Sequence, residues 1–466
     1  MWARSGAKTA VVEQYGFLGG MATMGLVTPL SVFTYNNEKV IGGIPWEFIE
    51  RLEKMGGCII EKPLGNVAFD PELYKLLCQQ MMLEAGVDMY MHSYLSGCQA
   101  KDGKISCILF ENKNGTEAIS ADMYIDCTGD GDLAAMAGVP MQTDECKPLQ
   151  PLSTYFILGG VDTDSPMIID AMHHNKQGQN CHCIAVREKL LAMKEALGIP
   201  EFGGPWFCTT LRPGEVTVNM TRTAGNAIDN RNFTAAECRL REDVFKIARI
   251  FKENFEEFKN SYVTTVAVHA GIRETRRIKG VHTITAEEYV NAYKLIHVAA
   301  GAEQSVTFLK KAAYVPYRAL IAEDFPNLLV AGRCISADKT SFASLRVQAS
   351  CMGVGQAAGV AAAQCIKAGV TVQKADIHNL IEELKKLGAI IIKKNQNMEQ
   401  LDYIIILLYF LGLIAVSVVM SRKIKNSEDM FIAGRNSSWW LSGVSSYMTI
   451  FSSCCTLSWR SIVYCR

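Results

Sequence analysis

The 466-residue chain lacks an excess of charge, paired cysteine motifs and the complete glycine fingerprint of a dinucleotide-binding turn. Its 47 basic and 47 acidic residues cancel, which argues against nucleic acid or an anionic membrane surface as its main partner. None of the sixteen cysteines forms a Cys-x-x-Cys pair or has ferredoxin spacing. No signal peptide opens the chain, so we expect reduced thiols and a cytoplasmic location for this part.

The first thirteen residues predict the end of a helix, a stop at Gly6 and a strand that ends in Glu13. In a dinucleotide-binding unit such an acid takes the adenosine ribose hydroxyls, about 20 residues after the GxGxxG turn. Counted back from Glu13, that turn would precede Met1. The sequence therefore predicts an N-terminal truncation that removes the first strand and the phosphate-binding glycines; a different fold starting at Met1 is the alternative.

A stretch near the C-terminal end of the globular part has the features of a cofactor cradle. Leu328–Ala331 predicts a buried strand, which Gly332-Arg333 breaks. Ser350–Gly353 is interpreted as a helix start, followed by an Ala/Gly-rich helix over Gly355–Ala363. A helix N-terminus offers free N–H groups and a partial positive charge to an anion or an electron-rich ring edge. Ordinary core packing of this helix is the alternative.

Other local patterns predict the framework around this stretch. Asp70-Pro71 predicts a capped helix that ends near Gly86. Residues 87–125 predict a strand and a hairpin with turns at 101–103 and 113–115. Further predicted elements are a strand over Ala121–Asp126, a β-run over Val216–Thr221, a long helix over Thr234–Phe258 and a terminal amphipathic helix within Thr371–Ile392.

Basic side chains crowd into Gly271–Ile278. If this segment is a strand, His269, Gly271 and Arg273 point to one side. A guanidinium can grip a carboxylate with two hydrogen bonds or stabilise an anionic reaction centre, and a histidine can move a proton near neutral pH. A solvated basic turn in which Glu274 pairs with an arginine is the alternative.

A second polar cluster leaves metal binding open. His173-His174 and Cys181-His182-Cys183 lie close together in the sequence, but their spacing fits no zinc module. A solvated loop is the favoured interpretation, and no metal site is predicted.

Six segments together resemble a known family: LLVAGRCISA, SLRV, GQAAGVAAA, GFLGGMAT, IDCTGDGD and GIRETRRI. They resemble the FAD-dependent oxidoreductases, which include the fumarate reductase flavoproteins and the flavin subunit of heterodisulfide reductase. The similarity runs to about residue 390. Lys339-Thr340 departs from it, standing where a His-Glu-type pair is expected.

The resemblance implies an α/β protein with a two-dinucleotide-binding-type FAD domain and an inserted α+β substrate domain. Residues 1–140 and 311–397 would form the FAD domain and 141–310 the insertion. FAD would exchange a hydride with a small substrate, while the electron partner stays open; 4Fe-4S clusters occur in relatives, but this chain has no ligand motif for one. The implied cofactor-binding residues are Glu13, Gly19, Gly20, Thr128, Gly129, Gly332, Arg333, Arg346, Gly353 and Gly355; the implied catalytic, substrate-side residues are His269, Arg273 and Arg276.

The tail from residue 398 to 466 has a different composition. Tyr403–Met420 is an uncharged apolar run at the lower limit of a transmembrane helix, followed by Arg422 and Lys423. The next residues, SEDMFIAGRNSSWW, resemble the start of a sodium/solute symporter. We expect this segment to enter a lipid bilayer, and a fusion of two unrelated genes would explain the chain.

Two other functions stay open at this stage. A membrane-tethered, non-catalytic fragment would follow if loss of the phosphate-binding turn abolishes FAD binding. A nicotinamide-dependent enzyme is weaker, because no GxGxxG occurs in the chain.

Overall fold

The computed structural model describes residues 1–31, 33–35, 38–61, 66–142, 148–168, 184–288, 315–391, 407–415 and 418. The chain forms two units, Met1–Ile392 and Lys393–Arg466. In the second unit, residues 407–415 are helical, and the remainder of the predicted span over 403–420, apart from residue 418, lies outside the described residues. The first unit contains all of the sheets and the predicted site.

Parallel strands form the framework on which the two ends of this unit meet. The pairs are β1 (Ala10–Val12) with β6 (Asp88–Tyr90), and β10 (Tyr124–Asp126) with β15 (Leu328–Val330). Each pair is a separate two-stranded sheet, and β15 also takes an antiparallel bridge from Ile321. Within the described chain, β1 and β10 each have a neighbour on one edge only. The predicted strands at 121–126 and 328–331 are thus confirmed in shorter form, and parallel pairing confirms the α/β class.

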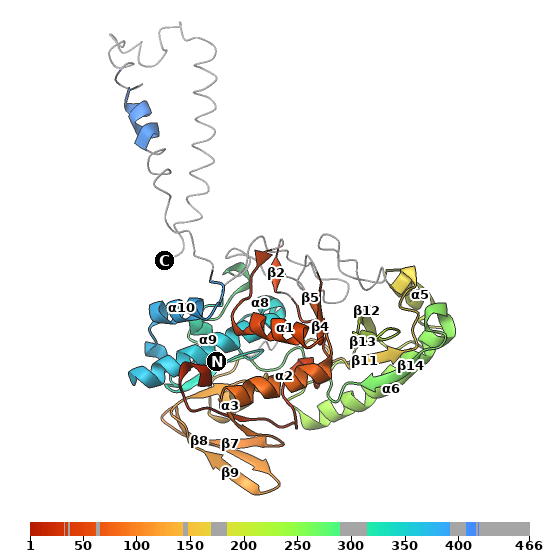
Figure 1. Ribbon diagram of the computed structural model, residues 1–466, viewed down its shortest axis with the longest axis horizontal. Coiled ribbons are helices and arrows are strands. Elements are labelled where there is room, and N and C mark those ends of the chain that lie inside the picture. Colours follow the sequence, from red (N-terminus) through yellow and green to blue (C-terminus); the bar gives the residue numbers. More distant parts are fainter. Residues whose placement is uncertain are drawn as a thin grey trace. The chain divides into compact units, whose positions relative to one another are not determined.

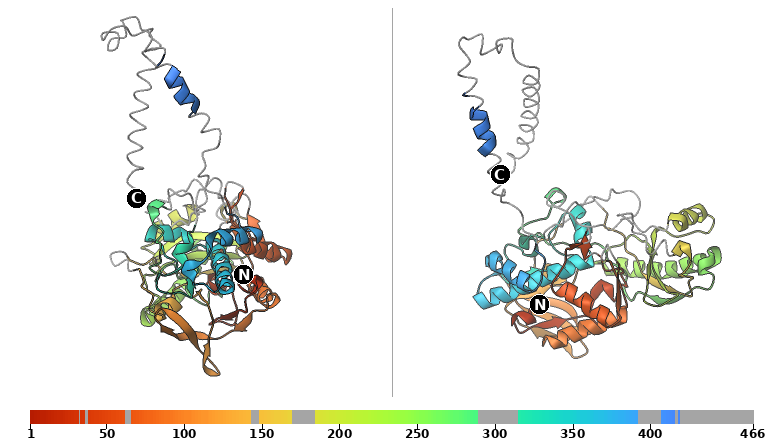
Figure 2. Two further views of the ribbon diagram at one scale, coloured as in Figure 1. Left: turned by 90° about the vertical axis from the view of Figure 1, so that its left-hand side faces the viewer. Right: turned by 45° about the horizontal axis from the view of Figure 1, so that its top comes forward.

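Helices from both ends of the unit pack around these strands. Ile44 N–H of helix α1 donates a hydrogen bond to Gln356 of helix α9 (3.0 Å), and the views in Figures 1 and 2 show these segments side by side. The helices of this part are α1 (Ile44–Lys54), α2 (Pro71–Glu84), α3 (Asp132–Met136), α8 (Lys339–Leu345), α9 (Gln348–Ala368) and α10 (Ile377–Lys386), with short 3-10 helices at Ala3–Ser5, Gly20–Ala22, Tyr317–Leu320 and Val372–Lys374.

Helix α2 begins where the sequence predicts it. The Asp70 carboxylate accepts hydrogen bonds from Glu72 N–H and Leu73 N–H, and Pro71 is the first helical residue. This is the usual way to satisfy the free N–H groups of a helix start.

Helix α9 begins earlier than predicted. It starts at Gln348, so Gly353 and Gly355 lie inside the helix and not at its start. The N-cap residue is Val347, which makes no side-chain capping bond. By length and composition α9 is also the one helix of the described residues that could cross a membrane, but 56% of its apolar stretch is buried within the protein. It is a core helix.

Antiparallel strands complete the region before β10. Strands β7 (Tyr94–Lys101), β8 (Lys104–Asn112) and β9 (Gly115–Ile119) form one sheet, in agreement with the two predicted turns. Two small hairpins, β2 (Thr34–Tyr35) with β3 (Glu38–Lys39) and β4 (Cys58–Glu61) with β5 (Asn66–Phe69), lie near α1 in the sequence.

A four-stranded sheet forms the part between β10 and β15. Its order is β12-β13-β11-β14, and all neighbours are antiparallel. Helix α6 lies along one face (Figure 1), burying Val244, Ile247 and Phe251 against it. The elements are β11 (Phe156–Gly159), α5 (Ile184–Met193), β12 (Phe202–Thr209), β13 (Val216–Thr221), α6 (Asn230–Asn254), a 3-10 helix at Glu256–Phe258 and β14 (Tyr262–Val266). The predicted run Val216–Thr221 is confirmed, and the predicted helix at 234–258 is confirmed with a start at Asn230.

Candidate functional site

The turn after β10 is held by Asp126. Its carboxylate accepts hydrogen bonds from Thr128 N–H (3.0 Å), from the Thr128 hydroxyl (2.7 Å) and from Ala134 N–H of α3 (2.9 Å). Asp126 itself is 1% exposed. A buried carboxylate with three donors is satisfied, so the path of the Cys127–Asp132 turn is fixed by its own sequence.

The same turn positions Arg333, which follows β15. Its guanidinium forms an ion pair with Asp130 (Nη2–Oδ1, 2.8 Å), and both side chains are largely buried. A side chain at Gly129 would come within 2.8 Å of this guanidinium. The residues Gly129 and Arg333, distant in sequence and both predicted for the cofactor site, therefore lie in direct contact.

Arg276, from the segment between β10 and β15, joins this cluster. Its Nε donates to the carbonyl oxygen of Asp130 (3.0 Å), and its Nη2 pairs with Asp132. Burial, followed by repulsion from Asp130, raises the pKa of Asp132 to about 6. Asp132 is thus a carboxyl group that can hold or release a proton near neutral pH.

Open space adjoins four of the predicted glycines. No atom would lie within 4 Å of a side chain placed at Gly20, Gly332, Gly353 or Gly355. At Gly19, by contrast, Thr23 and Tyr74 would obstruct it. Bare glycine backbone beside free space is what a closely approaching ligand needs.

Glu13 directly follows β1, in agreement with the prediction. His269 lies close to Tyr15, two residues after Glu13. Tyr15 N–H donates to the Glu13 carboxylate (3.0 Å), and burial raises the pKa of Glu13. The His269 ring meets Tyr15 edge-on (6.2 Å between centroids) and Phe233 (5.1 Å). Among the described residues no hydrogen bond or ring contact joins His269 to Arg273, so these two predicted partners have separate surroundings.

Residues 267–278 are not the regular strand that the alternation argument assumed. Only Gly271 and Ile278 form isolated bridges there. Arg273 donates to the Pro151 carbonyl oxygen (2.7 Å), and Arg346 donates to the Gln150 side chain (3.0 Å). Glu274 pairs with Arg277 (2.8 Å), so the predicted pairing of this carboxylate with an arginine is observed, but in the interior and not in a solvated turn.

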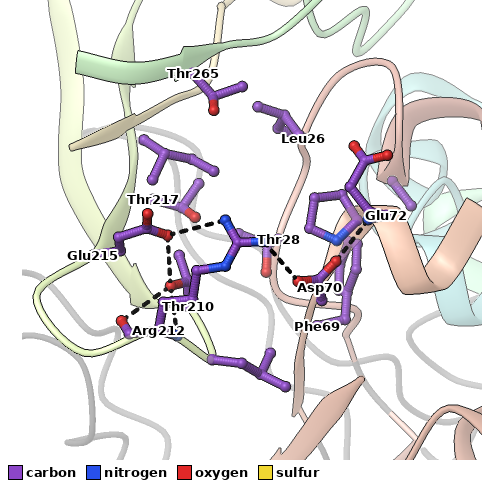
Figure 3. Close-up of a pocket in the computed structure, with 14 residues that line it drawn as sticks. Leu26, Thr28, Phe69, Asp70, Glu72, Thr210, Arg212, Glu215, Thr217 and Thr265 are labelled. Carbon is purple, nitrogen blue, oxygen red and sulfur yellow. Dashed lines mark hydrogen bonds and ion pairs between the residues drawn. The ribbon is translucent and has the colours of Figure 1, made fainter. Parts of the chain in front are cut away.

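A hollow of about 630 Å³, open solvent included, lies between the start of α2 and the β12–β13 turn. Figure 3 shows the Arg212 guanidinium between Asp70 (3.3 Å) and Glu215 (3.9 Å) at its edge. None of the cofactor-binding or catalytic residues predicted from the sequence lines this hollow.

The His/Cys cluster at 173–183, for which a solvated loop is favoured over metal binding, lies outside the described residues. Where the structure does describe the chain, no group of three His, Cys, Asp or Glu side chains could hold a metal ion. The same described residues also contain no group of side chains that could ligate an iron–sulfur cluster.

The residues present fit FAD at the cradle side. The four open glycines leave room, and three buried polar atoms have no hydrogen-bond partner: Arg333 Nε, Arg346 Nε and Gln348 Oε1. Buried polar groups are normally satisfied, so these atoms indicate a ligand. Glu13, which directly follows β1, is the acid predicted to take the ribose in such a site.

Comparison with known proteins agrees with this fit. A profile of the family described as FAD dependent oxidoreductase matches residues 1–384. No curated protein sequence matches the chain significantly.

The similarity of the chain to solved structures is low. A geranylgeranyl bacteriochlorophyll reductase-like protein from Thermoplasma acidophilum has 12% identity and a TM-score of 0.40, covering 83% of this chain and 78% of that one. A flavin-dependent brominase has 12% identity and a TM-score of 0.43, covering 82% and 78%. An aklavinone-11 hydroxylase, solved with FAD and aklavinone, has 13% identity and a TM-score of 0.39, covering 78% and 59%. At these scores the structures add nothing to the family match.

Proposed function

Because the chain belongs to the FAD-dependent oxidoreductase family, we propose that it transfers a hydride between FAD and a small, carboxylate-bearing substrate. It is an FAD-dependent enzyme, and FAD, when bound, supplies the two-electron chemistry. The chain's own residues bind and orient the cofactor and the substrate. We assign residues 1–140 and 311–397 to the cofactor and 141–310 to the substrate side.

The observation that carries this proposal is the contact between Gly129 and the Arg333–Asp130 pair. It brings the turn after β10 and the turn after β15 together, and Arg333 Nε stays buried without a partner. A guanidinium held by one carboxylate keeps its remaining donors in a fixed direction. Gly20, Gly332, Gly353 and Gly355 give free backbone beside open space, and Glu13 would take the ribose.

The substrate-side roles follow from the surroundings of each predicted residue. Arg273 is proposed to bind a substrate carboxylate, because it has no acidic partner in the described chain. Arg276 is proposed to orient Asp132, whose carboxyl oxygen can hold a proton near neutral pH. His269 is proposed to close the cofactor side through its edge-on contact with Tyr15.

The visible spectrum of the purified full chain tests this function. We expect a flavin absorbance band near one FAD per chain, bleached when the protein is reduced. Arg333→Gln should lower FAD affinity about tenfold, since it removes a charged hydrogen-bonding group. Arg51→Gln, in a half-exposed ion pair with Glu47, is the matched control and should leave affinity unchanged. A folded, colourless protein that takes up no added FAD would contradict the proposal.

For the second unit we propose insertion into a membrane through residues 403–420. The described part of that run, residues 407–415, exposes its large apolar side chains, among them Leu407, Phe410 and Ile414. Carbonate extraction of membranes from cells that produce the full chain tests this. Recovery of the protein in the wash would contradict it.

A further inference from the structure

The hollow beside the start of α2 has one wall made by the four-stranded sheet, on the face that α6 does not cover. Val216 and Val218 of β13 belong to the buried cluster under α6, so Thr217 points to the opposite face. Ile157 of β11 pairs with Thr217 on one side and with Thr265 of β14 on the other. These last three side chains form a row across three strands, and all of them line the hollow.

Residues that precede β10 in the sequence form the opposite wall. Leu26 belongs to the same buried cluster as Ile157, while Phe69 ends β5 and Asp70 caps α2. Leu26, Phe69 and Ile157 are buried, and all three line the hollow. An apolar surface with a few polar groups at its edge suits a ligand that has a hydrocarbon body.

Two largely buried carboxylates meet at the rim from the two walls. The side chains of Asp70 and Glu215 are 16% and 18% exposed. In the part of the chain that the structure describes, Arg212 is the one cation that pairs with either of them (Figure 3), at 3.3 Å from Asp70 and 3.9 Å from Glu215. Two acidic groups therefore share a single positive charge.

Arg212 is held only loosely in this position. Its side chain is 63% exposed, its distance to Glu215 is longer than a hydrogen bond, and an exposed ion pair contributes little to stability. Asp70 does not depend on it, because the other carboxylate oxygen of Asp70 accepts N–H bonds from Glu72 (2.8 Å) and Leu73 (3.1 Å). A cation from solution can therefore replace Arg212 while the start of α2 stays capped.

A buried hydroxyl without a partner lies in the sheet wall of the hollow. Thr217 is 5% exposed and lines the hollow, and no described residue forms a hydrogen bond with its side chain. Glu215 is two residues earlier, directly before β13, so alternation places both side chains on the same face of the sheet. Buried hydroxyl groups are normally hydrogen-bonded, and Thr217 therefore indicates a polar ligand at this place.

We propose that the hollow binds a small organic cation with an apolar body, whose guanidinium group takes the place of Arg212 between Asp70 and Glu215. A planar guanidinium can donate to two carboxylates at once, and the Thr217 hydroxyl would accept a further hydrogen bond from it. Arg212 is then an internal competitor for the site. The site goes beyond the proposed oxidoreductase function, since none of the residues assigned to FAD or to the substrate lines it.

Calorimetric titration of the full chain tests the site. Phenethylguanidine is the probe, and 2-phenylethanol, which lacks the charge, and guanidinium chloride, which lacks the ring, are titrated at the same ionic strength. We expect one saturable site for phenethylguanidine and at least about tenfold weaker binding of each comparison compound, because one loses the charge-assisted bonds and the other the apolar contact. Absence of saturable binding, or equal affinity for 2-phenylethanol, would overturn the proposal.

Arg212→Gln is the most discriminating variant, because an internal competitor predicts a gain in affinity. Its removal frees both carboxylates, so phenethylguanidine should bind about threefold more tightly or better. Glu215→Gln and Asp70→Asn should each weaken binding about tenfold, since each removes a charge-assisted contact, and asparagine still caps α2. Unchanged or weaker binding by Arg212→Gln would contradict the proposal.

Glu72→Gln is the matched control for the loss of one negative charge. Glu72 lines the same rim, but its side chain is mostly exposed and pairs with Lys75 (2.7 Å). Affinity should change less than about twofold in this variant. An effect equal to that of Glu215→Gln would show that overall negative charge attracts the cation, and the site would be refuted.

Thr217→Val keeps the test valid if a charge variant does not fold. Valine has a similar shape and removes a hydroxyl that has no partner to lose, so this variant should melt no lower than the unmodified chain. Its affinity for phenethylguanidine should fall about threefold or more, and full affinity would contradict the placement of the ligand. The flavin spectrum is recorded separately, so binding of phenethylguanidine by a colourless protein supports this site while contradicting the proposed enzyme.

Discussion

The substitution Gly129→Ala tests the contact on which the cofactor site depends. Gly129 has a φ of +84°, and a side-chain carbon there would lie 2.8 Å from Arg333 Nη1. Alanine therefore meets two separate costs, one from the backbone conformation and one from the displaced guanidinium.

The first cost is about 1 kcal/mol for a non-glycine residue in the left-handed region. The second arises because Arg333 must move away from Asp130. Removing one partner of a buried ion pair costs about 3–5 kcal/mol, and displacement retains part of the pair, so about 1–3 kcal/mol remains. We expect Gly129→Ala to lower the free energy of unfolding by about 2–4 kcal/mol.

Denaturant unfolding is the suitable assay, because about 1 kcal/mol shifts the melting temperature of so large a unit by only about 1 °C. Gly138→Ala is the matched control. Gly138 has a φ of +90°, and nothing lies within 4 Å of its added carbon, so that variant meets the backbone cost alone.

The difference between the two alanine variants isolates the displaced ion pair. If the two alanine variants lose the same free energy of unfolding within about 0.5 kcal/mol, the contact between Gly129 and Arg333 does not contribute measurably to stability, and the reasoning is refuted. Asp130→Asn in the Gly129→Ala background adds a check, because the second substitution should then cost less than it does alone.

Three further predictions concern charge, cradle and cap. The pKa of Asp132 is raised from 3.8 to about 6. The folded state therefore keeps this proton to a higher pH than the unfolded state does, and the free energy of unfolding falls as pH rises between these two values. In denaturant unfolding measured across pH, Asp132→Asn should be more stable than the unmodified chain above about pH 6 and no more stable than it below about pH 4. Gly353→Ala should stabilise the FAD-free protein by about 0.5–1 kcal/mol, because Gly353 is inside α9. The same substitution should weaken FAD binding in a fluorescence titration. Unchanged FAD affinity would show that Gly353 does not contact the cofactor. Asp70→Ala should cost about 1 kcal/mol in denaturant unfolding through loss of the α2 cap, and Asp70→Asn, which keeps an acceptor, should cost less; equal losses would point to the Arg212 pair instead.

Short sequence patterns predicted an element correctly where the residues that determine that element are neighbours in the chain. Asp70-Pro71 starts α2 as predicted, and β13 has the predicted bounds Val216–Thr221. The start of α9 was misplaced because its N-cap, Val347, makes no capping bond. A helix that begins without a capping residue leaves no signal in its sequence.

The partners within the site could not be predicted in the same way. Glu13, Gly129 and Arg333 were identified from motifs, but the ion pair between Arg333 and Asp130 depends on how β10 and β15 pair. Pairing between residues so far apart in sequence is set by tertiary packing.

The β1–β6 ladder has a consequence for the order in which the molecule opens. Ala10 is exposed, while Val11 and Val12 are half-buried, and none of the three belongs to a buried apolar cluster. Segments with so little buried apolar surface unfold locally at a small fraction of the global free energy. In native-state hydrogen exchange the amides next to Glu13 should therefore lose protection well before those of α9, so that a bound ribose would stabilise a segment that otherwise unfolds locally.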